Sequence, residues 1–302
     1  MPRTSFDALL EAGAHFGHLK RKWNPNIAPY VFGEKNGIHI IDLNKTIAKL
    51  DEAANALKQI AKSGRTILFV ATKKQAKNII IEKIKEINMP CVTERWTGGM
   101  LTNFATIRRS VRKMADMNKM ASDGTLATLS KKEKLQLSRQ RDKLQQQLGT
   151  IANMTRLPAA VFVVDIIKEH IAISEAHKLN IPTFAIVDTN SDPNLVDFPI
   201  PANDDSSTSI RVIVDTVSQA IKEGIEERKE AQVNNKQGVK KEEEVIEEEE
   251  TTDTEEEEVK DIEAAATADE DNEEEVPEEI EKKIKGAKEK KVAPKKPSKV
   301  TK

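Results

Sequence analysis

Thr66-Ile67-Leu68-Phe69-Val70-Ala71 is a continuous apolar run with the length of one β-strand. Strands buried on both faces of a parallel sheet have this composition, whereas strands with one wet face alternate apolar and polar residues. Two further runs, 159–165 and 182–188, have the same character. Helical patterns separate the runs, and this alternation predicts an α/β domain whose mostly parallel sheet carries helices on both faces.

The segments around these runs complete the predicted domain. Helices are expected where apolar residues recur at helical spacing, over 42–62, 75–87, 169–179 and 207–223. Residues 30–32 and 38–41 flank Gly33-Glu34-Lys35-Asn36-Gly37, which predicts a β-hairpin with a five-residue loop. Short extended segments are expected at 90–93 and 198–201.

A basic helical hairpin interrupts the α/β pattern. Two long polar helical patterns, 104–120 and 131–148, follow a glycine-bearing turn at 95–103. Residues 104–149 contain 11 Lys and Arg against 4 Asp and Glu, so self-repulsion disfavours the hairpin unless an anion lies beside it. A narrow apolar seam predicts an antiparallel coiled-coil arm, built from Ile107, Val111, Met114, Leu135, Leu144 and Leu148.

The charge divides the chain into two parts. Residues 1–225 carry 32 basic and 23 acidic residues, whereas 226–302 carry 16 and 27. Within the second part an acidic segment precedes a lysine-rich one, and neither has enough apolar residues to form a core. We therefore predict a globular domain over 1–225, with the inserted arm at 104–149, and a disordered acidic then basic tail over 226–302. The tail is either a binding segment or a solvating extension.

Several function classes are excluded by absent residues and motifs. Cys91 is the only cysteine, so a disulfide within the chain is impossible and a reducing, intracellular location is expected. No apolar run reaches the ~18 residues of a membrane span. No glycine-rich phosphate loop or nucleophile elbow follows the strands, which argues against an enzyme. Asp165 and Asp188, at strand ends, are open to two interpretations, as catalytic carboxylates or as turn caps.

Lys20-Arg21-Lys22-Trp23 forms a second basic segment, beside the turn residues Asn24 and Pro25. One interpretation is a nucleic-acid contact, in which the cations neutralise phosphates and the indole stacks on a base or sugar. The other is a solvated basic turn whose tryptophan folds onto the domain.

Four blocks of sequence resemble one known family. They are Leu9–His18, Arg95–Asn103, 158–182 with Glu169-His170-Ile171-Ala172, and Phe184–Pro193. Together they resemble the bacterial small-subunit ribosomal protein S2 family over about residues 5–225, while the tail departs from the family's short C-terminus. The resemblance implies a flavodoxin-like α/β fold with a coiled-coil arm and a cytoplasmic, structural role in translation on the small ribosomal subunit.

The resemblance also implies partners and contact residues. The partners are 16S-type ribosomal RNA and neighbouring small-subunit proteins, including the mRNA-binding protein S1, with no membrane, no small-molecule substrate and no required cofactor. Arg95 and Trp96 are expected to anchor the root of the arm. The residues expected near RNA are Lys20, Arg21, Lys22, Trp23, Arg95, Trp96, Arg108, Arg109 and Arg112.

A metal site is implied by the same resemblance. The matching positions are His18, Asp188 and Asp205, with Asp204 adjacent. One imidazole and two carboxylates suit zinc or, less selectively, magnesium. The alternative is that His18 only hydrogen-bonds a loop carboxylate and no metal takes part.

Overall fold

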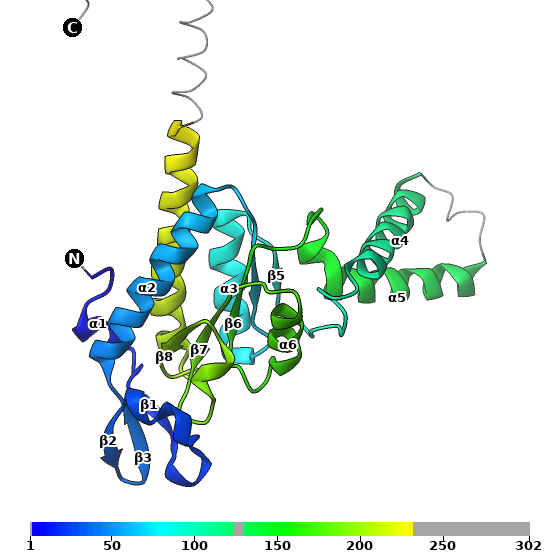
Figure 1. Ribbon diagram of the computed structural model, residues 1–302. Coiled ribbons are helices and arrows are strands. Elements are labelled where there is room, and N and C mark those ends of the chain that lie inside the picture. The colour runs from blue at the N-terminus through cyan, green and yellow to red at the C-terminus, as the bar shows by residue number, and fades with distance from the viewer. Residues whose placement is uncertain (1, 124–129, 232–302) are drawn as a thin grey trace, which may run out of the picture. The chain divides into compact units, whose positions relative to one another are not determined.

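The structure is a computed structural model that describes residues 2–123 and 130–231 (Figure 1). Its central sheet has five parallel strands: β4 (Ile67–Val70), β5 (Cys91–Val92), β6 (Ala160–Val164), β7 (Thr183–Val187) and β8 (Phe198–Pro201). Their spatial order is β5-β4-β6-β7-β8, which is the 2-1-3-4-5 order of flavodoxin-like sheets. The predicted parallel α/β sheet is therefore confirmed. The order reverses between β4 and β6, where ligands of such sheets often lie.

A row of aromatic residues crosses the sheet. The strand registers align Phe69, Phe162, Phe184 and Phe198 on four consecutive strands. The rings of Phe69 and Phe162 lie 5.3 Å apart, and those of Phe184 and Phe198 stack at 4.4 Å. Burying one such side chain contributes roughly 1.5–3 kcal/mol. The row favours this register, because a slip of one strand by one residue would turn the ring of that strand to the other face.

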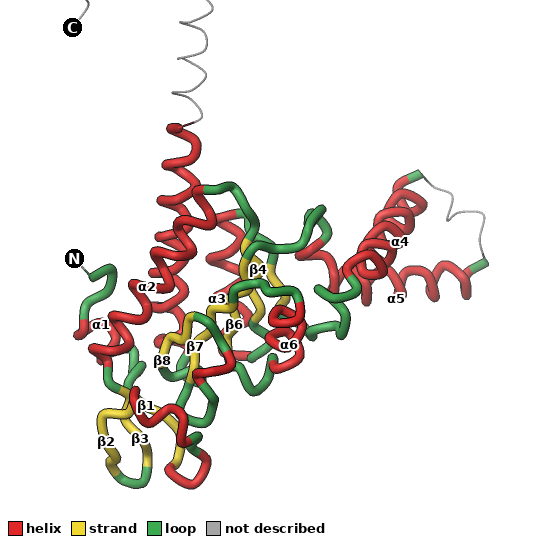
Figure 2. The backbone as a smooth tube through the Cα atoms, viewed as in Figure 1, coloured by secondary structure: helices red, strands yellow, loops and turns green. Residues whose placement is uncertain are grey.

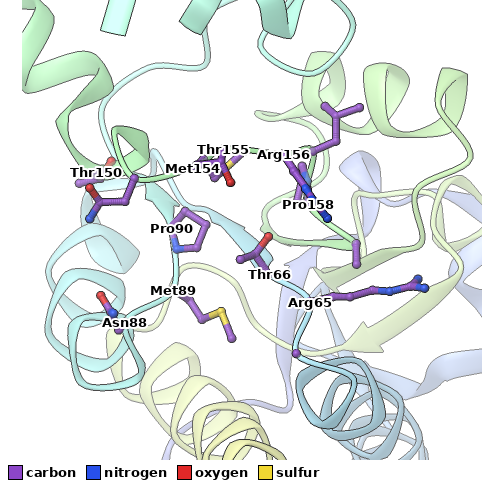
Figure 3. A pocket seen from close by; sticks show the side chains of 14 residues that line it. Arg65, Thr66, Asn88, Met89, Pro90, Thr150, Met154, Thr155, Arg156 and Pro158 are labelled. Atoms are coloured by element: carbon purple, nitrogen blue, oxygen red, sulfur yellow. The ribbon is translucent and has the colours of Figure 1, made fainter. Parts of the chain in front are cut away.

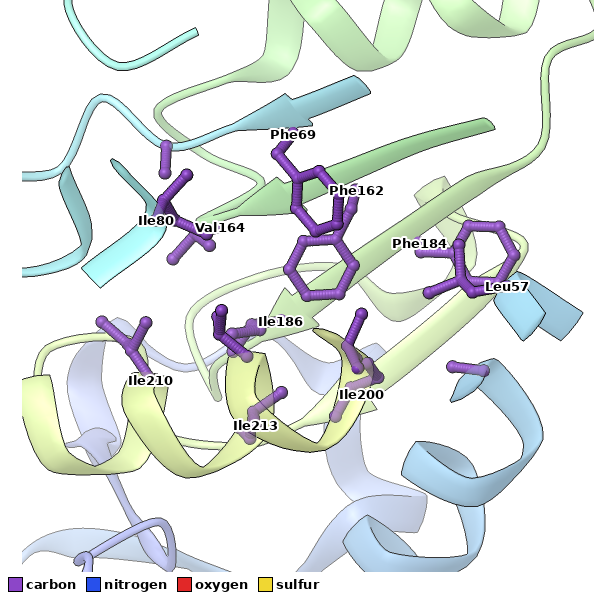
Figure 4. Close-up of a cluster of buried hydrophobic side chains, with 14 of the residues drawn as sticks. Leu57, Phe69, Ile80, Phe162, Val164, Phe184, Ile186, Ile200, Ile210 and Ile213 are labelled. Carbon is purple, nitrogen blue, oxygen red and sulfur yellow. The ribbon is translucent and has the colours of Figure 1, made fainter. Parts of the chain in front are cut away.

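The two faces of the sheet belong to two separate cores. Ile67 and Phe69 of β4 point into one core, and the alternate residues Leu68 and Val70 point into the other. The first core is covered by α2 (Leu43–Lys62), α3 (Lys74–Ile87) and the last helix, 207–231. Figure 4 shows Phe162 and Phe184 of this core above Ile213 of the last helix. The second core is covered by α6 (His170–Lys178) and by the base of the arm.

The N-terminal part forms a small antiparallel sheet after α1 (Phe6–Glu11). Its strands are β1 (Phe16–Leu19), β2 (Val31–Lys35) and β3 (Ile38–Ile41), in the order β1-β3-β2, and Figure 2 shows the strands of both sheets in yellow. Short 3-10 turns, Lys20–Lys22 and Pro25–Tyr30, join β1 to β2. The hairpin is confirmed, but the five-residue loop is wrong, because β2 continues through Lys35. Asn36 and Gly37 alone make the turn, with φ of 54° and 74°, values that Asn and Gly tolerate in a two-residue turn.

The inserted helices are α4 (Phe104–Ser122) and α5 (Lys131–Leu148), followed by a 3-10 turn, Gly149–Ile151. Ile107 and Met114 of α4 and Leu148 of α5 are buried, as the predicted seam requires. Leu135 is 53% exposed, so its place in the seam is wrong. Leu137 lines a small pocket with Met117 instead, since the inward stripe of α5 passes through 137, 141, 144 and 148, which turns position 135 outwards. The connection 124–129 lies outside the described residues.

The last helix is longer than expected. It continues through residue 231, the last described residue, so the predicted start of the tail at 226 is wrong for 226–231. Glu227 forms ion pairs with Lys58 (2.7 Å) and Lys62 (2.9 Å) of α2, and these pairs hold the extra turns against the domain. The rest of the predicted tail lies outside the described residues. Within 2–123 and 130–231, no helix combines the length and apolar character needed to cross a bilayer.

Candidate nucleic-acid interface and metal site

The N-terminal basic turn is open to solvent. Lys20, Arg21 and Lys22 are all exposed, since the turn follows β1 at the edge of the small sheet. Lys20 forms an ion pair of 2.7 Å with Glu34 of β2. In the described part of the chain, Arg21 and Lys22 have no ion pair. The turn therefore presents two free cations and one that is partly neutralised.

Trp23 folds onto the domain. Its side chain is only partly exposed, and its ring lies 4.8 Å from that of His39, with 31° between the planes. It also packs against the core on the α6 side of the sheet. Trp23 is therefore folded onto the domain, as in the second interpretation, with its ring beside that of His39.

The root of the arm is organised by one carboxylate. Glu175 of α6 is only 6% exposed, and its oxygens accept a hydrogen bond from Trp96 Nε1 (3.1 Å). The loop after Trp96 supplies four more donors, at 2.7 to 3.2 Å: Gly99 N, Leu101 N, Thr102 N and Thr102 Oγ1. Five donors around one buried carboxylate satisfy the charge and, with the buried side chains of Met100 and Leu101, fix an irregular loop.

These donors also control the ionisation of Glu175. Burial acts to raise the pKa of Glu175, but the hydrogen bonds from Thr102, Trp96, Gly99 and Leu101 outweigh it and hold the pKa below its usual value. The carboxylate is therefore ionised at neutral pH and remains an acceptor for all five donors.

Trp96 is an anchor and not a contact surface. Its side chain is 7% exposed, which leaves little surface for the predicted RNA contact, while the expectation that it anchors the arm root fits the bond to Glu175. Arg95, its neighbour, is exposed. The chain alternates here between one side chain facing the core and one facing water.

The arginines of α4 have two different environments. Arg109 and Arg112 are exposed, on a face turned away from the buried Ile107 and Met114. Arg108 is partly buried, and its Nη1 donates to the carbonyl oxygen of Thr155 at 2.9 Å. Arg109 and Arg112 can therefore meet an external phosphate, whereas Arg108 ties α4 to the segment that precedes β6.

The carboxyl ends of β7 and β8 gather acidic groups around His18. His18 Nδ1 lies 2.9 Å from Asp188 Oδ2, and Nε2 lies 3.4 Å from Asp205 Oδ2. The backbone N–H of His18 donates to Thr189 Oγ1 at 2.7 Å. Gly17 is required beside it, because any Cβ there would collide with the side chain of Thr189.

Lys73, which follows β4, reaches the same carboxylates. Its Nζ lies 2.8 Å from Asp204 Oδ1, 2.6 Å from Asp205 Oδ1 and 3.5 Å from Asp165 Oδ2. Although burial lowers the pKa of Lys73, these carboxylates raise it overall, so the side chain remains an ammonium. For Asp204, burial and the nearby Asp188 raise the pKa to about 7 against the opposing effect of Lys73.

Three potential ligand atoms converge within this cluster. His18, Asp188 and Asp204 each offer one ligand atom, and these atoms lie within 4.8 Å of one another. His18 Nδ1, Asp188 Oδ2 and Asp204 Oδ2 are buried and have no hydrogen bond within the described residues. His18 and Asp188 are close enough to pair, but their geometry is not that of a hydrogen bond. Lys73 pairs with both aspartates, but the expected third ligand, Asp205, is 54% exposed, and the structure groups the buried Asp204 with His18 and Asp188 instead.

Comparison with known proteins gives the family. The sequence profile described as Ribosomal protein S2 matches residues 9–224, which include the arm root, α4 and all the clustered carboxylates. The chain belongs to the ribosomal protein S2 family. The resemblance found in the sequence is therefore confirmed.

Members of the S2 family from several bacteria are close in sequence. A small ribosomal subunit protein uS2 of Phocaeicola vulgatus is 65% identical over 234 residues, which cover 78% of this chain and 84% of the relative. The uS2 protein of Porphyromonas gingivalis is 64% identical over 229 residues, 76% and 82% of the two chains. That of Azobacteroides pseudotrichonymphae is 61% identical over 236 residues, 78% and 90%.

The S2 family is structural, and the chain is accordingly not an enzyme but a protein with a structural role in translation. The strand-end carboxylates agree with this assignment. Asp165 has a left-handed φ of 71° and its Oδ1 accepts from Lys168 N at 3.1 Å, so it caps a turn. Asp188 Oδ1 accepts from the backbone and hydroxyl of Thr189.

Two functional residues of this S2 chain were missed by sequence reasoning, Glu175 and Lys73. Glu175 lies on a helix where a glutamate is ordinary, and its only unusual feature is that it falls within the inward stripe with Ala172 and Ala176. Lys73 appears in the sequence as part of a Lys-Lys pair after a strand. The inward position of Glu175 was the available sign, since a buried carboxylate requires donors.

Proposed function

We propose that this chain is a structural constituent of the small ribosomal subunit, on the cytoplasmic ribosome, where it binds 16S-type ribosomal RNA and neighbouring small-subunit proteins, including the mRNA-binding protein S1. Its family and the names of its relatives support the assembly. The observation that carries RNA binding is the α4 face with Arg109 and Arg112, exposed at helical spacing above a buried seam. This role involves no membrane and no small-molecule substrate.

The proposed contact residues divide into two groups. Exposed cations contact phosphates, and buried or paired groups set their positions. The first group is Lys20, Arg21, Lys22, Arg95, Arg109 and Arg112. The second is Trp96, Arg108 and Glu175, which fix the direction of α4 relative to the sheet. In this proposal, residues 1–231 form the RNA-binding domain and 104–149 its arm.

Co-sedimentation tests the assignment. Tagged full-length protein is run with small ribosomal subunits through a high-salt sucrose gradient, beside Arg109→Gln/Arg112→Gln and the control Arg211→Gln. Arg211 is an exposed arginine of the last helix, far along the chain from the arm. We expect wild type and the control to travel with the subunit and the double variant to be released at lower salt. Folded wild-type protein that stays at the top of the gradient would refute the assignment.

We also propose a divalent cation at His18, Asp188 and Asp204, although the fold does not require one. The observation that supports it is the convergence of three buried ligand atoms that lack hydrogen bonds. One imidazole nitrogen with two carboxylate oxygens suits Zn²⁺ better than Mg²⁺, which prefers oxygen ligands. Bound there, the ion would join the N-terminal segment to the carboxyl edge of the sheet.

Elemental analysis of purified protein tests this site. Wild type is expected to retain a stoichiometric metal through gel filtration and His18→Ala to lose it. Absence of metal from both proteins, after purification in zinc-supplemented buffer, would leave the alternative, in which His18 pairs with Asp188 alone.

A further inference from the structure

The amino edge of the parallel sheet carries a groove that the proposed contacts above do not use. It encloses about 830 Å³ and is lined by the residues that immediately precede β4, β5 and β6 (Figure 3). These are Gly64-Arg65-Thr66, Asn88-Met89-Pro90 and the segment 153–159, together with Thr150. The groove lies at the edge opposite to the His18 cluster, because the strands are parallel and that cluster follows their carboxyl ends.

The groove has positive charge without neutralising partners. Its lining includes Arg65 and Arg156 but no aspartate or glutamate. Both arginines are exposed, and neither guanidinium has an ion pair or a hydrogen bond within the described residues. By contrast, Lys73 and Lys77, which follow β4 at the opposite edge of the sheet, are paired with carboxylates.

Further arginines stand at its rim. The guanidinium of Arg228 packs directly over Gly64, where any Cβ would collide with it. Arg108 of α4 donates to the carbonyl oxygen of Thr155, in the groove wall. The groove is therefore continuous with the base of the arm, so a ligand that follows α4 to its root meets the groove next.

We propose that this amino-edge groove binds the phosphate backbone of ribosomal RNA, through Arg65 and Arg156, as a contact separate from that of α4. The inference rests on the proposed function, since it takes RNA as the partner. Guanidinium groups match phosphate oxygens with paired N–H donors. The amide of Asn88 and the hydroxyl of Thr66 in the lining suit the 2′-hydroxyl and sugar oxygens of RNA.

A folded polyanion fits the groove better than a small anion does. Arg65 comes from the segment before β4 and Arg156 from the segment before β6, two neighbouring strands, so the groove offers two separate cations along its length. The groove is open, and open sites gain affinity from several spaced phosphate contacts that release counterions. Two attachment points, the groove and α4, would fix the orientation of the domain on the RNA.

The test measures RNA affinity against salt concentration. Full-length wild type, Arg65→Gln/Arg156→Gln, Arg109→Gln/Arg112→Gln and the control Arg211→Gln are titrated with 16S-type ribosomal RNA. Loss of two phosphate contacts should reduce the slope of log affinity against log salt by about 1.4 to 1.8. At about 0.15 M salt this corresponds to roughly twentyfold weaker binding, if the salt-independent part is unchanged. Circular dichroism confirms folding, which the exposure of both arginines favours.

The outcomes separate the groove from the proposed function. A reduced slope for both double variants, with the control equal to wild type, supports the groove. If the α4 variant has a reduced slope while the groove variant keeps the wild-type slope, the groove inference is overturned and the proposed function stands. If the groove variant binds RNA normally but fails to join subunits, the groove contacts a protein and the inference is again overturned. If wild type does not bind RNA, both fail.

Discussion

Trp96 Nε1 lies 3.1 Å from Glu175 Oε1, and this bond joins the loop at the base of the arm to a helix 79 residues further along the chain. With four more donors on the same carboxylate, it makes Glu175 the point at which the arm is fixed to the sheet. The direction of α4 therefore depends on a residue outside the arm.

Replacing Glu175 with Gln should destabilise the protein and weaken RNA binding. The amide retains one acceptor oxygen but turns an NH₂ group towards donors, so buried N–H groups lose their partner. We expect a loss of about 1–3 kcal/mol in the free energy of unfolding, measured with urea. Glu82→Gln, an exposed carboxylate on α3 with only a 3.5 Å pair, is the control and should be neutral. Equal stability of the two variants would contradict the role of Glu175.

The contribution of Glu175 should depend on pH. Its folded pKa is below its usual value, so the ionised form is favoured by folding. The stabilisation is therefore fully present above the unfolded pKa of about 4.3, and it is lost as the pH falls through the lower folded pKa. The difference in unfolding free energy between wild type and Glu175→Gln should be constant from pH 7 to about pH 5 and should shrink below that. A difference that grows on acidification would contradict the sign of the shift.

Each exposed arginine of α4 should contact one phosphate of the RNA. Arg109→Gln should reduce the salt slope of RNA binding by about 0.7 to 0.9, because one counterion-releasing contact is lost. Arg108→Gln differs, since Arg108 already donates to Thr155 within the protein, and it should change stability more than the salt slope. Titrations at four salt concentrations compare the two. An identical slope change for both variants would show that Arg108 also reaches RNA.

The metal site should depend on Asp204 and not on Asp205. Asp204 is buried and belongs to the converging group, whereas Asp205 is 54% exposed and lies outside it. Asp204→Asn should therefore lose the proposed metal, and Asp205→Asn should retain it, as measured by elemental analysis after gel filtration. Because the two residues are adjacent and undergo the same chemical change, each variant is a matched control for the other. Loss of metal in Asp205→Asn alone would restore the ligand set expected from the resemblance.

The end of the last helix should contribute to stability. A chain that ends at 225 loses the pairs of Glu227 with Lys58 and Lys62, whereas a chain that ends at 231 keeps them. We expect the shorter chain to melt a few degrees lower, a difference that decreases in high salt because both pairs are solvent-exposed. Equal melting temperatures would mean that the extra turns add nothing to the domain.

The sequence predicted the elements of this fold because each of them has a periodicity of its own. The run 66–71 is apolar throughout since both faces of β4 are buried, and the apolar residues of 42–62 recur at helical spacing since one face of α2 is covered. Where two helices share a narrow seam, the pattern was weaker, and Leu135 was placed inward although it is exposed. The basic character of α4 was also evident, because exposed charges follow directly from composition.

Only the tertiary structure decided which side chains meet. Asp204 and Asp205 are equivalent in sequence, but the chain that leaves β8 buries the first beside His18 and Asp188 and leaves the second 54% exposed at the rim of the cluster. Trp96 and Glu175 are 79 residues apart, and Arg65 and Arg156 come from separate segments before neighbouring strands. The periodicity of apolar residues indicates which face of a helix or strand is buried. Contacts between distant elements depend on strand order and on the close approach of loops at the sheet edges, which local pattern does not encode.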